Sequence, residues 1–184
     1  MNSTGARLFK WRRGQWAAIH RGNILKVAVA TAGGLGLSPI APGTTGALAG
    51  VAIYLLLVVL SSGFTLTACL VCSLVVIGVL NHVLTPWAQA FWKDKDPSAF
   101  VLDEVAGFLV VPILAPAADP LVVVSLGFLC FRVFDTIKIP PAWQIDRKMG
   151  GAWGILLDDL VSGAYASLAV HGFEYWRHIQ TTVQ

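Results

Sequence analysis

Long apolar segments, separated only by short polar or turn-forming stretches, constrain this chain most. The 184 residues are 56% hydrophobic and 12% charged, which is about half the charge of an ordinary soluble domain. The mean hydropathy is +0.71. We therefore predict an all-α protein, an integral membrane helical bundle of short apolar helices and helical hairpins. The apolar segments lie at about 46–60, 64–81, 105–118, 121–134 and 155–171.

The shortness of these segments leaves a second architecture open. A helix rises about 1.5 Å per residue and a bilayer core is about 30 Å thick, so a span needs roughly 20 residues. Shorter segments cross only if flanking residues join them or the membrane thins. The alternative is a compact helical bundle around a wholly apolar central helix. In either case, turns at 61–63 and 118–120 join the segments into two helical hairpins.

Basic residues gather at the start of the chain, where six of the thirteen precede residue 27. With Trp11 and Trp16 between them they could bind nucleic acid. The bias of Lys and Arg toward the cytoplasmic side of membranes favours a membrane-surface segment instead. We predict that residues 1–23 form this cytoplasmic segment, 24–172 a single helical domain and 173–184 a C-terminal tail. We expect membrane lipids and no nucleic acid as partners.

The predicted topology brings most of the polar motifs to one face of the membrane. If the N-terminus is cytoplasmic, the first hairpin crosses outward and returns, which leaves loop 82–104 inside. The second hairpin does the same, and the last segment enters at about residue 155. The turn at 38–45, both pairs of adjacent acids and Asp135 then meet at the cytoplasmic face of a multi-pass protein.

Two adjacent-acid motifs, "DEVAG" at 103–107 and "DDLVSG" at 158–163, share a pattern. In each, an acid and a glycine lie one helical turn apart, and small residues let helices pack closely. Carboxylates drawn together in this way repel one another unless a cation offsets their charge. Each pair could instead simply begin a helix, where the dipole favours acids. We favour a Mg²⁺ site, with candidate ligands Asp103, Glu104, Asp135, Asp158 and Asp159.

Two further motifs could hold an anion. Arg132, Asp135 and Lys138 share a helical face, so the two basic residues could bind phosphate, although a surface ion pair is the simpler interpretation. The stretch "SPIAPGTTGALAG" leads into a helix whose first N–H groups could also hold phosphate. It lacks the nucleotide-binding pattern GxxxxGK[ST], so we expect no nucleotide partner. The candidate phosphate-binding residues are Arg132, Lys138, Pro42, Gly43 and Thr44.

These groups together indicate phosphoryl chemistry on a lipid headgroup. Asp103, Glu104, Asp158 and Asp159 are the candidate catalytic residues. The alternative is a non-catalytic membrane transporter or assembly factor that uses its acidic clusters to bind ions. A transporter of that kind favours acids that face each other at mid-membrane, whereas these acids lie at segment ends beside basic residues.

Four motifs in this order, "GLGLSPIAPGTTGALAG", "VLDEVAGFLV", "FRVFDTIK" and "GILLDDLVSGAYA", resemble the phosphatidylglycerophosphatase A family. The resemblance covers about residues 24 to 170. It implies a Mg²⁺-dependent phosphatase of the bacterial cytoplasmic (inner) membrane. Such an enzyme hydrolyses phosphatidylglycerophosphate to phosphatidylglycerol and inorganic phosphate in glycerophospholipid synthesis. By resemblance, the motif positions are Pro39, Pro42, Gly43, Thr44, Asp103, Glu104, Gly107, Arg132, Asp135, Lys138, Asp158, Asp159 and Gly163.

Overall fold

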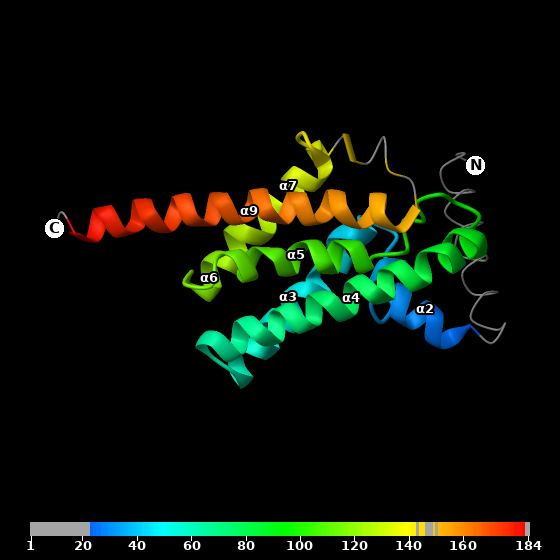
Figure 1. The fold of residues 1–184 in the computed structure, drawn as a ribbon, viewed down its shortest axis with the longest axis horizontal. Helices are drawn as coiled ribbons and strands as arrows, with labels where there is room; N and C mark the ends of the chain where they lie inside the picture. The colour runs from blue at the N-terminus through cyan, green and yellow to red at the C-terminus, as the bar shows by residue number, and fades with distance from the viewer. Residues whose placement is uncertain (1–22, 143, 146–148, 150, 183–184) are drawn as a thin grey trace.

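A computed structural model describes residues 23–142, 144–145, 149 and 151–182, and these residues form helices and loops without a strand. The expected basic segment 1–23 lies, apart from Asn23, outside the described residues, as do Asp146, Arg147 and Lys148. Helices α4 (Gly63–Trp92), α5 (Leu102–Leu114) and α9 (Gly151–Thr182) run side by side along the molecule, and α9 projects well beyond the others toward the C-terminus (Figure 1). The prediction of an all-α membrane bundle is confirmed.

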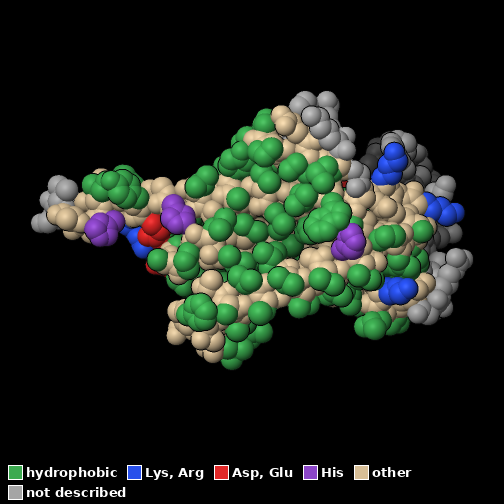
Figure 2. All heavy atoms as spheres, viewed as in Figure 1, with side chains coloured by type: hydrophobic (Ala, Val, Ile, Leu, Met, Phe, Trp, Pro, Cys, Tyr) green, Lys and Arg blue, Asp and Glu red, His purple; other side chains and the backbone are tan. Residues whose placement is uncertain are grey.

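In the part of the chain that the structure describes, four helices are long and apolar enough to cross a membrane. They are α3 (Pro42–Leu60), α4 (Gly63–Trp92), the continuous helix Pro120–Ile137 and α9 (Gly151–Thr182). Helix Pro120–Ile137 comprises α6 (Pro120–Val122), the π-helical stretch η2 (Val123–Gly127) and α7 (Phe128–Ile137). Large apolar side chains stay exposed on these helices, including those of Val59, Phe64 and Val75. Hydrophobic side chains cover the middle of the molecule in Figure 2, as a lipid-facing surface requires.

Helix α5 (Leu102–Leu114) forms the centre of the bundle rather than a span. Its 13 residues rise about 20 Å, too little to cross a bilayer core. It packs against α3, α4 and α9, and its residues from Val105 to Pro112 are buried. The expected hairpin is present, but its first arm is enclosed by the other helices. The fold therefore combines features of the two architectures considered above, a membrane bundle and an enclosed central helix, which here is apolar only after its acidic first turn.

Two helices extend past the apolar segments seen in the sequence. Helix α4 continues through Pro86 to Trp92, because Asn81, Leu84, Thr85 and Ala88 extend its buried face with helical spacing. The loop between α4 and α5, expected at 82–104, is consequently 93–101. Helix α9 continues to Thr182, so most of the expected tail 173–184 is helical.

Glycines set the close approach of the helices that carry the polar motifs. A Cβ on Gly107 would lie 2.7 Å from a ring carbon of Phe131 and 2.9 Å from the Cβ of Asp159. A Cβ on Gly163 would collide with the carbonyl oxygen of Gly107 and come within 3.0 Å of Val110. Contacts this short exclude a side chain, so α5 and α9 cross at these two glycines. The crossing brings the acidic start of α5 beside the acids of α9.

Candidate active site

A cleft of about 830 Å³ opens where the starts of α3 and α5, the end of α7 and the first turns of α9 meet. Among the described residues, six acidic and three basic ones line it, in a chain with few charges. Lys and Arg side chains also gather at this end of the molecule in Figure 2. The acids are Asp96, Asp103, Glu104, Asp135, Asp158 and Asp159, and the bases are Lys95, Arg132 and Lys138.

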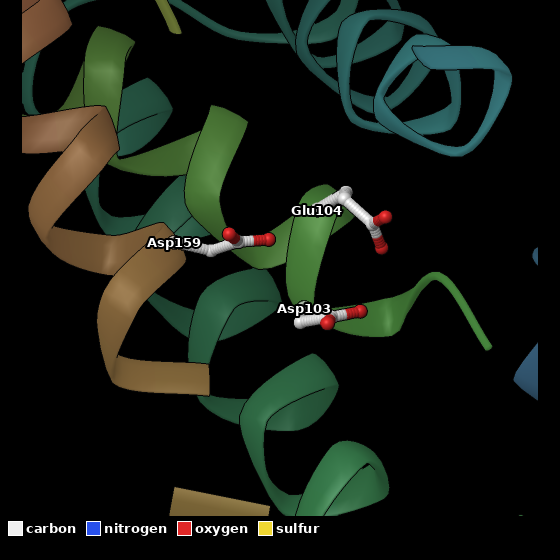
Figure 3. Close-up of side chains that lie close together, drawn as sticks. All are labelled: Asp103, Glu104 and Asp159. Carbon is white, nitrogen blue, oxygen red and sulfur yellow. The ribbon is translucent and has the colours of Figure 1, made fainter. Parts of the chain in front are cut away.

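Three of the acids, Asp103, Glu104 and Asp159, form a group that we call the acidic triad. One carboxylate oxygen from each lies within 4.8 Å of the corresponding oxygens of the other two. Asp103 and Glu104 come from the first turn of α5, and Asp159 reaches them from α9 (Figure 3). The triad therefore depends on the Gly107–Gly163 crossing, which holds the two helices at the necessary distance.

Because the carboxylates of the triad are buried, bringing them together is energetically unfavourable unless a positive charge lies among them. Asp103 and Asp159 are 7% and 3% exposed. Asp103 Oδ1, Glu104 Oε2 and Asp159 Oδ2 are buried, and none has a hydrogen-bond partner among the described residues. Buried carboxylate oxygens without partners are strongly unfavourable. A hard divalent cation such as Mg²⁺ takes oxygen ligands of this kind, so the residues present fit a magnesium site.

The same burial affects the proton affinity of the α5 acids. Desolvation, together with the negative charge of Glu104, raises the pKa of Asp103 well above its usual range. Desolvation also raises the pKa of Glu104 to about 6, even though the Asp103 side chain and the charge of Arg132 act to lower it. Both acids therefore hold protons more readily than exposed carboxyls do while no cation is bound.

The other two predicted ligands lie in ion pairs beside the triad. The Nζ of Lys138 lies 2.8 Å from Oδ2 of Asp158, and Nη1 of Arg132 lies 2.8 Å from Oδ2 of Asp135. Each pair places a basic group on the cleft, where the adjacent acid fixes it. Asp158 and Asp159 are neighbours in sequence, yet one pairs with a lysine and the other joins the triad.

The turn before α3 closes one side of the cleft. Pro42 and Gly43 line it, whereas Thr44 is not among its lining residues. The hydroxyl of Thr45 donates a 2.7 Å hydrogen bond to the carbonyl of Leu35 and so ties this turn to the preceding 3-10 helix. A Cβ on Gly43 would collide with the Glu104 carboxylate and lie 3.0 Å from Nη2 of Arg132. Glycine therefore lets the start of α3 lie directly against these charged groups.

The sequence motifs gave no indication of two further polar residues, Gln89 and Ser98, that line the cleft. Gln89 lies in the last turns of α4, and Ser98 lies in loop 93–101. The position of Gln89 on a helix was not predicted, because the apolar pattern that indicates this helix weakens after residue 81. Loop 82–104 was expected at the same membrane face as the acidic motifs, but no motif in its sequence indicated that it lines the cleft.

A family profile and several known proteins are similar to this chain over most of its length. The sequence profile described as phosphatidylglycerophosphatase A matches residues 28–174. A protein of Escherichia coli named "Phosphatidylglycerophosphatase A" is 34% identical over 138 residues, covering 73% of this chain and 74% of the relative. A Haemophilus influenzae protein of the same name is 31% identical over 144 residues, covering 78% and 85%.

A third relative carries a different substrate in its name. It is a Bacteroides thetaiotaomicron protein named "Putative phosphatidylinositol-3-phosphatase", 32% identical over 155 residues, which cover 82% of this chain and 94% of the relative. No solved structure matches the chain. The profile spans the starts of α3, α5 and α9 and the end of α7, and thus every element that contributes to the cleft.

Proposed function

The chain belongs to the phosphatidylglycerophosphatase A family, and we propose that it hydrolyses phosphatidylglycerophosphate to phosphatidylglycerol and phosphate in a Mg²⁺-dependent step of phospholipid biosynthesis. The observation that carries this proposal is the acidic triad, whose buried oxygens lie in one cleft with Arg132 and Lys138. Acids alone would suit ion passage. Acids beside two basic groups suit a phosphate ester and a metal ion together.

Asp103, Glu104 and Asp159 would hold the Mg²⁺, which when bound supplies positive charge to the phosphate oxygens. Arg132 and Lys138 bind the same phosphoryl group, because basic side chains in a partly buried site donate strong hydrogen bonds to phosphate. Their paired acids, Asp135 and Asp158, keep them oriented toward the cleft. The first N–H groups of α3, next to Gly43, add partial positive charge on a third side.

Hydrolysis replaces the ester oxygen on phosphorus by the oxygen of water. The bond between phosphorus and the glycerol oxygen breaks, and that oxygen leaves with a proton as a hydroxyl group. We assign acceptance of the water proton to Asp158, which lines the cleft beside Lys138. Lys138 stabilises the charge that develops on the phosphoryl group and the departing oxygen.

The end of the molecule that holds the cleft is proposed to face the cytoplasm. Lys26, Lys93, Lys95 and Lys138 lie at this end in loops and at helix termini. Lys and Arg accumulate on the cytoplasmic side of membrane proteins. A cytoplasmic-membrane enzyme oriented in this way meets its lipid substrate at the inner leaflet.

Purified protein in detergent tests the proposal through phosphate release from phosphatidylglycerophosphate, first with Mg²⁺ and then with excess EDTA. We expect release that EDTA abolishes, and loss of release in Asp103→Asn and Asp159→Asn. Asp94→Asn is the matched control, because Asp94 is exposed and does not line the cleft. Phosphatidylinositol 3-phosphate serves as a second substrate. No release from either lipid would instead support the transporter or assembly-factor alternative.

A further inference from the structure

We propose that Lys95 is a specificity residue that binds the phosphodiester of the lipid substrate, while the triad end of the cleft takes the terminal phosphomonoester. This proposal rests on the proposed function, because the lipid named there carries both groups, separated by a glycerol unit. A subsite for the second phosphate would let the enzyme distinguish this lipid from one with a single phosphate.

The cleft is large enough to hold more than one phosphate. Its volume of about 830 Å³ lies within the roughly 300–1,000 Å³ that encloses a whole drug-sized ligand. The triad, Arg132 and Lys138 occupy the side formed by α5, α7 and α9. Gln89, Lys95 and Ser98 also line the cleft, from α4 and loop 93–101. A headgroup with two anionic groups can therefore contact the triad end of the cleft and the residues from α4 and loop 93–101 at once.

Lys95 differs in its pairing from Arg132 and Lys138, the other basic residues among the described lining of the cleft. Arg132 is paired with Asp135 and Lys138 with Asp158. Within the described part of the chain, no carboxylate lies within ion-pair distance of the Lys95 ammonium. Its charge thus has no internal partner there, and an anionic ligand would supply one.

The loop that carries Lys95 is fixed beside the triad. The amide Nε2 of Gln89 donates a 2.6 Å hydrogen bond to the carbonyl of Lys95. At the other end of the loop, the N–H of Val101 donates a 3.0 Å bond to the carbonyl of Ala30. The charge of Asp96 acts on the Asp103 carboxyl, which places this part of the loop near the triad.

The chemistry of a phosphodiester suits a lysine at an exposed position. A diester carries one negative charge, spread over two oxygens, and a lysine ammonium binds such a group as a compact point charge. Lys95 is exposed, so it lies toward the open side of the cleft. The diester is the phosphate nearer the acyl chains, and it would occupy this outer position while the terminal phosphate reaches the buried triad.

Lys95→Gln tests this assignment, with Lys93→Gln as its matched control. Both substitutions remove one exposed lysine charge from the same loop region, but Lys93 does not line the cleft. For phosphatidylglycerophosphate we expect Lys95→Gln to raise KM roughly fivefold or more, with kcat changed less than about twofold. Lys93→Gln should behave like the wild type, and Lys95→Arg should recover most of the loss.

Inhibition of the same reaction identifies which phosphate Lys95 contacts. Phosphatidylglycerol carries only the diester, and inorganic phosphate corresponds only to the terminal group. Lys95→Gln should weaken inhibition by phosphatidylglycerol while inhibition by phosphate stays unchanged. An unchanged KM, an equal loss in Lys93→Gln, or weaker inhibition by phosphate alone would overturn the assignment. Failure of the proposed function gives a different result, because the wild type would then release no phosphate.

Discussion

Gly107 of α5 and Asp159 of α9 lie so close that a Cβ added to Gly107 would come within 2.9 Å of the Asp159 Cβ. The missing side chain of Gly107 therefore decides how near Asp159 comes to Asp103 and Glu104. Helix packing and the proposed metal site are thereby linked at a single position. A substitution that changes the distance between α5 and α9 would therefore shift the proposed metal-binding oxygens even though no acidic residue is replaced.

Gly107→Ala should destabilise the protein and reduce phosphate release. The new methyl group would contact Phe131 at 2.7 Å as well as Asp159, and overpacking of this kind costs about 1–3 kcal/mol. Thermal unfolding in detergent and phosphate release measure the two effects. Gly172→Ala on α9 is the control, because its Cβ meets no atom within 4 Å. Wild-type stability and activity in Gly107→Ala would show that this crossing does not set the site.

Gly43→Ala should impair catalysis while leaving the fold intact. Its Cβ would push against the Glu104 carboxylate and Nη2 of Arg132, and a displacement of about 1 Å can cost roughly 100-fold in rate. We expect phosphate release to fall about 10- to 100-fold, with little change in Tm. Gly78→Ala is the control, since its Cβ would meet only Leu156 at an ordinary 3.8 Å. Equal activities of the two variants would contradict the close contact between α3 and Glu104.

Without Mg²⁺ the stability of the protein should fall as pH rises, and the stabilisation by Mg²⁺ should increase with pH. The folded protein raises the pKa of Glu104 from 4.5 to about 6, so without metal it binds this proton more tightly than the unfolded chain does. The metal-free protein therefore loses stability as pH rises from about 4.5 to about 6. Protonated carboxyls bind Mg²⁺ poorly, so the metal should stabilise the protein more at pH 7.5 than at pH 5.

Thermal unfolding at pH 5 and pH 7.5, with and without Mg²⁺, checks this expectation. Glu104→Gln serves as the control, because an amide does not titrate and the pH effect on metal-free stability should shrink. Equal stabilisation by Mg²⁺ at both pH values would contradict the proposed participation of the α5 acids.

Sequence patterns predicted much of the site because those patterns are local. An acid one helical turn from a glycine indicates both a polar group and a close helix crossing, and the crossing at Gly107 and Gly163 is present. Hairpin connectivity then brings the start of α5, the end of α7 and the start of α9 to one end of the bundle. Neither step requires knowledge of side-chain positions.

Pairing between neighbouring charges could not be predicted in the same way. Asp158 and Asp159 are adjacent residues of the same type, so the sequence does not distinguish their roles. The rotation of α9 against α5 and α7 decides that Asp158 pairs with Lys138 and that Asp159 joins the triad. The burial of α5 could not be predicted either, since a short apolar segment such as 105–118 is equally consistent with a membrane span and with an enclosed helix. Tertiary packing decides both outcomes.

The dependence of phosphate release on Mg²⁺ concentration, compared between Asp159→Asn and Asp158→Asn, tests the central claim most directly. Asp159→Asn should require at least about tenfold more Mg²⁺ for half-maximal release, because it removes a proposed ligand. Asp158→Asn should lower kcat and keep the wild-type Mg²⁺ requirement, because Asp158 is paired with Lys138 instead. The same Mg²⁺ requirement in wild type and Asp159→Asn, or full wild-type release in EDTA, would contradict the claim that the acidic triad holds a catalytic metal ion.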